Sequence, residues 1–166
     1  DKPWPGNLFY ASTHLGPGSA LWDYLDELNG YITRCQEILQ NTRPDSDLLL
    51  YYPVYDIWQK AGEDMVIMQD VHNPEKWLFN TAFGHTAKFL YENGYSFDYI
   101  SDDQLGILAR NPEKILPPYK AILVPQVQYM PLSTLTELLK LRDRGYPLIF
   151  LGHLPLEVPG QKDYET

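Results

Sequence analysis

Adjacent carboxylates are the first residues in this chain that could do chemistry, and Glu63-Asp64 and Asp102-Asp103 are two such pairs. Hydrolysis of a glycosidic bond needs two carboxyl groups facing one bond, roughly 5–9.5 Å apart. Adjacent residues of a strand point to opposite sides, so Asp102 and Asp103 are better interpreted as helix-capping residues, whose oxygens accept N–H bonds at a helix start. Glu63-Asp64 is typical of a turn in solvent. We therefore predict no catalytic residue in this chain.

The sequence also lacks the residue spacings that are typical of metal sites and of activated nucleophiles. The four histidines are His14, His72, His85 and His153. None has the spacing to another His or Cys that metal sites use, so we expect no metal, and we interpret the last three as ordinary polar residues. The single cysteine, Cys35, belongs to a helical pattern, so no intrachain disulfide can form. No serine lies in the Gly-x-Ser-x-Gly elbow of a serine hydrolase.

Phosphate-binding sequences are absent where a cofactor would need them. A flavin phosphate loop needs small hydroxyl and glycine residues, so that backbone N–H groups can face the phosphate. The expected first strand is instead followed by Pro53-Val54-Tyr55-Asp56, which offers bulk, a proline without N–H and a negative charge. There is no dinucleotide fingerprint or Walker loop either. We expect no cofactor, which disfavours a flavodoxin-like signalling or cofactor protein.

Four short apolar runs alternate with helical patterns and indicate the elements that position these residues. The runs are Leu48–Tyr52, Ser96–Ile100, Lys120–Val124 and Pro147–Leu151. One helix is expected from Asn73-Pro74 to Asn93-Gly94 and another from Pro131 to about Gly145, whereas 54–72 looks irregular. Such alternation is typical of an α/β fold with a parallel sheet between two helical layers. We predict a flavodoxin-like three-layer sandwich with strand order 2-1-3-4, in which right-handed crossovers put helices on both faces of the sheet.

A loop and a long helix precede this sheet. Asp1–Gly18 is rich in Pro and Gly, and Ser19 is expected to cap a helix over Ala20–Gln40. Its apolar residues form one stripe: Leu21, Leu25, Leu28, Ile32, Cys35 and Leu39. A stripe this wide needs a covering partner. We therefore expect either self-association through this helix or folding of the Trp4–Tyr10 loop over it. The predicted domains are 1–42 and 43–166.

Charge and composition exclude several classes of partner. Thirteen basic and 22 acidic residues give a net charge of −9, which repels nucleic acid and anionic membrane surfaces. No apolar run approaches the roughly 18 residues of a membrane span, and no signal segment opens the chain. The aromatic content is high, at 14%. These rings are expected to serve core and domain-contact packing or, in a sharper interpretation, stacking on sugars.

Three stretches, taken in order, resemble one family. They are Pro3–His14 (PWPGNLFYASTH), then Leu28–Gln36 (LNGYITRCQ) leading to Pro44–Pro53 (PDSDLLLYYP), and finally Tyr129–Leu135 (YMPLSTL). Their order and spacing resemble the middle of large bacterial α-L-rhamnosidases of glycoside hydrolase family 106. In such proteins a catalytic (β/α)₈ barrel is followed by an α/β domain similar to the one after the barrel in some β-galactosidases.

The resemblance implies a place for each part of the chain. The opening loop would end the last barrel loop, so Trp4, Tyr10 and His14 would lie near the sugar. The first helix would be the barrel's last, and the α/β domain would be a non-catalytic accessory that braces the barrel. The acid and base carboxylates would lie upstream, in a parent that is periplasmic or secreted. A stand-alone carbohydrate- or protein-binding module is the alternative.

Overall fold

The computed structural model describes residues 16–43, 45–59, 72–112 and 119–160. The chain divides into two compact units, Asp1–Pro44 and Asp45–Thr166. Each unit is described by itself below. Within the described residues, no helix is long and apolar enough to cross a membrane.

The first unit contains a 3₁₀ turn, η1 (Trp22–Tyr24), followed by the helix α1 (Leu25–Gln40). The expected start at Ala20 was wrong. The Ser19 hydroxyl accepts a hydrogen bond from the backbone N–H of Leu21, at 3.2 Å. This local bond holds a turn where the helix was expected to begin. The apolar stripe continues along α1, but none of the helix residues is buried.

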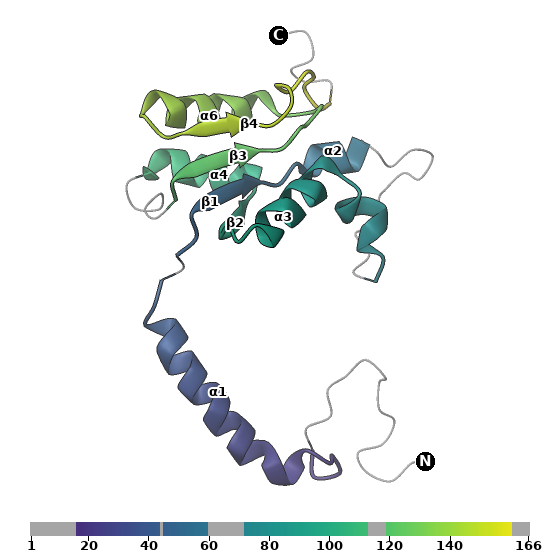
Figure 1. The fold of residues 1–166 in the computed structure, drawn as a ribbon, viewed down its shortest axis with the longest axis vertical. Coiled ribbons are helices and arrows are strands. Elements are labelled where there is room, and N and C mark those ends of the chain that lie inside the picture. Colours follow the sequence, from purple (N-terminus) through teal and green to yellow (C-terminus); the bar gives the residue numbers. More distant parts are fainter. Residues whose placement is uncertain (1–15, 44, 60–71, 113–118, 161–166) are drawn as a thin grey trace. The chain divides into compact units, whose positions relative to one another are not determined.

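The second unit is built on one parallel sheet, as predicted (Figure 1). Its strands are β1 (Leu48–Tyr51), β2 (Phe97–Ile100), β3 (Ala121–Val124) and β4 (Leu148–Phe150). The order is β2-β1-β3-β4, which confirms the predicted 2-1-3-4 arrangement. Leu48 pairs with Phe97 on one side and with Ala121 on the other, and Ile122 pairs with Leu148. β1 and β3, the two central strands, are short apolar runs because both faces of the sheet are covered there.

Helices lie on both faces of this sheet (Figure 1). They are α2 (Val54–Gln59), the π-helical turn η2 (Glu75–Phe79), α3 (Ala82–Glu92), α4 (Asp102–Arg110) and α6 (Leu132–Asp143). The larger core packs α4 and α6 against one face, through Leu105, Leu108, Leu138 and Leu141. The smaller core packs α3 against the other face, through Phe83 and Leu90. Below, the face with the larger core is called the thick side of the sandwich, and the face with the smaller core is called the thin side.

Two expected elements differ from the structure. Residues 54–59 form α2 where an irregular segment was expected, and burial of Ile57 fixes this short helix. The helix expected over 73–93 is broken at Thr81, whose extended backbone and side chain cap α3 by accepting from the N–H of Gly84. The expected stop at Asn93-Gly94 is confirmed, because Gly94 adopts a φ of +76°.

Candidate functional site

The carboxyl ends of β1 and β3 meet where the strand order reverses, and open α/β sheets bind ligands at such a point. Asp56, on α2 just after β1, occupies it. Its carboxylate accepts from the backbone N–H of Gln128, at 2.9 and 3.1 Å, and from that of Tyr129, at 2.6 Å. These N–H groups belong to the loop after β3. The chain's own carboxylate therefore fills the position that a bound anion would take.

A second carboxylate, Asp102, is also held by the fold. It accepts from the Tyr51 hydroxyl at 2.8 Å and from the Thr134 hydroxyl. Tyr51 is fully buried. Burial, followed by the negative charge of Asp102, raises the pKa of Tyr51 far above its ordinary value. The neutral hydroxyl therefore remains a donor, and this network joins β1, α4 and α6.

The capping role expected of Asp102 and Asp103 was wrong. Ser101 caps α4 by accepting from the N–H of Gln104, and the Gln104 side chain accepts in return from the N–H of Ser101. The two aspartates occupy the first turn of α4, where only Asp102 is partly buried and Asp103 is exposed. A serine followed by a glutamine three residues later was the signal for this cap.

A polar cleft of about 320 Å³ lies beside this network, lined by residues of α4 and α6 that include Asp103, Arg110, Ser133 and Glu137. No group of His, Cys, Asp or Glu among the described residues could hold a metal ion. The exposed side chains of the cleft include both acidic and basic groups. Such side chains are suited to contact with solvent or to weak polar contacts with a ligand.

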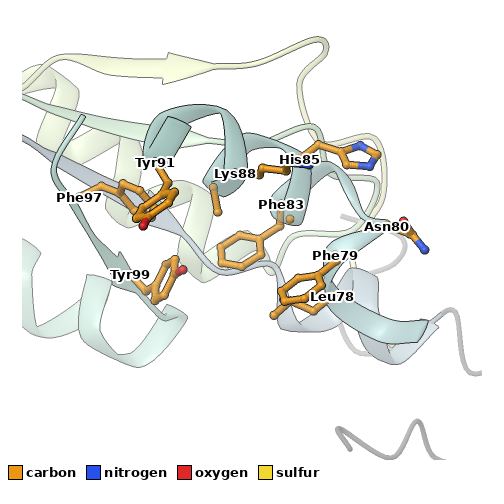
Figure 2. Close-up of a pocket in the computed structure, with 11 residues that line it drawn as sticks. Leu78, Phe79, Asn80, Phe83, His85, Lys88, Tyr91, Phe97 and Tyr99 are labelled. Atoms are coloured by element: carbon orange, nitrogen blue, oxygen red, sulfur yellow. The ribbon is translucent and has the colours of Figure 1, made fainter. Parts of the chain in front are cut away.

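An apolar groove of about 550 Å³ lies in the described part of the chain. It lies on the thin side of the sandwich, between η2, α3 and β2. Its aromatic lining is Phe79, Phe83, Tyr91, Phe97 and Tyr99. The rings of Phe83 and Tyr99 lie 5.3 Å apart, and those of Phe97 and Tyr99 lie 5.6 Å apart. Figure 2 shows these side chains gathered around the groove.

The groove did not emerge from the sequence. Its signal was the aromatic alternation of Phe97 and Tyr99 in an otherwise ordinary strand pattern, together with Phe79, Phe83 and Tyr91 at helical spacings. We interpreted such aromatics as core packing or sugar contacts. Tyr91 is 81% exposed and Tyr99 58% exposed. These two side chains are therefore only partly packed into the core of this unit.

The predicted site residues of the opening loop, Trp4, Tyr10 and His14, lie outside the described residues, as does the Glu63-Asp64 turn. Of the other histidines, His72 and His85 are exposed. His85 borders the groove, but its ring turns away from the aromatic side chains (Figure 2). His153 lies 2.8 Å, through Nδ1, from the Leu154 carbonyl.

No protein-family model matches the chain, and no curated protein matches it by sequence.

Proposed function

We propose that this chain is a non-catalytic accessory part of a larger carbohydrate-active enzyme, of the α-L-rhamnosidase-like kind. Its α/β unit would brace the upstream catalytic barrel of the same polypeptide, and the opening loop with Trp4, Tyr10 and His14 would shape one rim of the sugar site. The resemblance of the three stretches of sequence is the source of the glycoside hydrolase assignment.

The observation that carries the accessory role is the pairing, within the fold, of two backbone N–H groups at the carboxyl ends of the strands. An enzyme or cofactor protein of this architecture leaves donors free at the point where the strand order reverses. Here the N–H groups of Gln128 and Tyr129 are bound by Asp56. Groups already satisfied within the fold stabilise it and do not bind substrate.

The test compares the chain with its parent. Purified chain is expected to leave an aryl α-L-rhamnoside uncleaved, because no pair of carboxyl groups with the required arrangement is predicted in it. The coding region upstream of Asp1 is expected to encode a (β/α)₈ barrel. Turnover by the pure chain that is lost on replacing one of its carboxylates would contradict the proposal, as would an upstream region without a barrel.

The second candidate function is a binding module, and the apolar groove is the observation that favours it. Titration calorimetry distinguishes a carbohydrate-binding module from a scaffold that binds no sugar. A scaffold gives no saturable heat with L-rhamnose, whereas a carbohydrate-binding module gives a saturable isotherm. An apolar groove favours a protein partner over a sugar, as argued next.

A further inference from the structure

The strand β2 ends the sheet on one side, and in the described residues it pairs only with β1. The carbonyls of Ser96 and Ile100 accept from the N–H groups of Leu48 and Tyr52. Backbone groups of successive strand residues alternate between the two sides. The N–H and C=O of Phe97 and Tyr99 therefore face away from β1, toward the open edge.

The same two residues line the apolar groove. Successive strand side chains point to opposite faces, and Phe97 and Tyr99 both border the groove beside α3. Asp98, between them, lies on the other face and accepts from the Tyr119 hydroxyl at 2.6 Å. Phe97 and Tyr99 thus present aromatic side chains and backbone groups that pair with no described residue to one place.

The amide, imidazole and ammonium groups around the groove do not converge on it. Figure 2 shows the side chains of Asn80 and His85 directed away from the rings of Phe83 and Tyr99. Lys88, the charged lining residue, lies 3.7 Å from Glu92. A sugar would leave most of its hydroxyl groups without partners here, and buried polar groups without partners are costly.

In the described residues, three common protections against strand pairing are absent from this edge. Native edge strands are commonly blocked by lysine, proline or a bulge. The four residues of β2, Phe97 to Ile100, include neither lysine nor proline, and they pair with β1 in unbroken register. This edge is therefore able to accept another strand.

We propose that β2 is a docking edge for an extended segment of a partner protein, which adds to the sheet as a further strand. Its backbone would bond to Phe97 and Tyr99, and its apolar side chains, at every second position, would fill the groove between β2, α3 and η2. Four strand residues at about 3.3 Å each give a docking length of about 13 Å. The inference rests on this geometry and not on the glycoside hydrolase assignment.

The experiment selects random eight-residue peptides displayed on phage against the full chain. The expected winners carry apolar residues at alternate positions, and they bind as synthetic peptides. Hydrogen exchange then reports the backbone. The N–H groups of Phe97 and Tyr99 are expected to become protected on binding, while that of Asp98, which faces β1, is expected to change little.

Two variants on one helix separate the groove from general surface effects. Tyr91→Ala removes an exposed ring that lines the groove, whereas Phe89→Ala removes a ring that is 60% exposed and lies outside it. We expect Tyr91→Ala to weaken peptide binding about tenfold, which is typical of losing an aromatic anchor, and Phe89→Ala to leave it unchanged. Tyr99→Pro, which removes an outward N–H that β1 does not use, is expected to weaken it as well.

Several results would overturn the proposal. A selection that yields no binding peptide is one, and so are peptides without alternating apolar residues or equal effects of the Tyr91 and Phe89 variants. Unprotected N–H groups at Phe97 and Tyr99 in the bound state would mean that the groove holds an apolar ligand without strand addition. Self-association abolished by Tyr91→Ala in the absence of peptide would identify the occupant as a second copy.

Discussion

At the scale of single residues, the fold places two similar carboxylates in different roles. Asp102 accepts two hydroxyl bonds inside the sandwich, whereas its neighbour Asp103 is exposed. The difference arises because Tyr51 and Thr134 converge on one side of the first turn of α4. Removing the acceptor of a buried hydroxyl lowers the free energy of unfolding, because the hydroxyl is left without a hydrogen-bond partner. No buried hydroxyl relies on Asp103 as its acceptor among the described residues.

We predict that Asp102→Ala destabilises the chain by about 1–3 kcal/mol, because the buried Tyr51 hydroxyl loses its acceptor. Asp103→Ala is the matched control, since it removes the same charge from the same helical turn. Its cost is expected to stay within about 0.5 kcal/mol. Urea unfolding followed by circular dichroism measures both, and equal losses would show that the network contributes nothing.

Tyr119 gives a prediction in alkaline solution. Burial, and then the hydrogen bond to Asp98, raise the pKa of Tyr119 from 10.0 to about 12. A folded-state pKa above the unfolded value gives stability that is complete below pH 10.0 and is lost as the pH rises toward about 12. The free energy of unfolding is therefore expected to fall across this window.

Tyr119→Phe is expected to make that fall smaller, because the variant has no phenol to ionise at this position. Asp98→Asn keeps the phenol and removes the carboxylate, so the pKa of Tyr119 should drop toward its ordinary value. Tyrosinate absorbance during a pH titration reads this change. An unaltered titration in both variants would refute the coupling between Tyr119 and Asp98.

At the scale of elements, the junction between η2 and α3 depends on one glycine. A Cβ on Gly84 would lie 2.7 Å from the Phe79 Cα and closer still to the Leu78 carbonyl oxygen. The last residues of η2 therefore rest directly on the first turn of α3. This close approach shapes one end of the groove.

We predict that Gly84→Ala destabilises the chain by about 1–3 kcal/mol, because backbone atoms must move to admit the methyl group. Gly106→Ala is the matched control, since a Cβ on Gly106, within α4, meets no atom within 4 Å. There the better helix propensity of alanine should stabilise the chain by about 0.5–1 kcal/mol. Thermal unfolding distinguishes the two, and a shared sign would contradict the packing argument.

At the scale of the whole molecule, the apolar stripe of α1 has no cover among the described residues of its own unit. Leu28 is 42% exposed, Ile32 39% and Leu39 69%. Contiguous apolar surface of this kind is uncommon on a soluble monomer. Two outcomes predicted from the sequence remain predictions: self-association through this helix, and coverage by the loop of Trp4 and Tyr10, which lies outside the described residues.

We predict self-association that Ile32→Glu weakens, because a charge in the stripe opposes apolar pairing. Arg34→Glu places the same residue on the opposite side of α1 and changes the net charge more, so it controls for repulsion between the acidic chains. Sedimentation equilibrium of the full chain measures both. A clean monomer at all concentrations would reject self-association and leave the loop as the remaining cover.

The amino-acid sequence alone determined the sheet. Buried parallel strands need continuous apolar runs, so Leu48–Tyr51 and Ala121–Val124 were recognisable, and the right-handedness of the crossovers indicated helices on both faces. Only the tertiary structure decided the bond that Asp56 accepts from a backbone N–H 72 residues away, and the groove at β2. Both depend on groups distant in the chain meeting in space, which a local pattern does not specify.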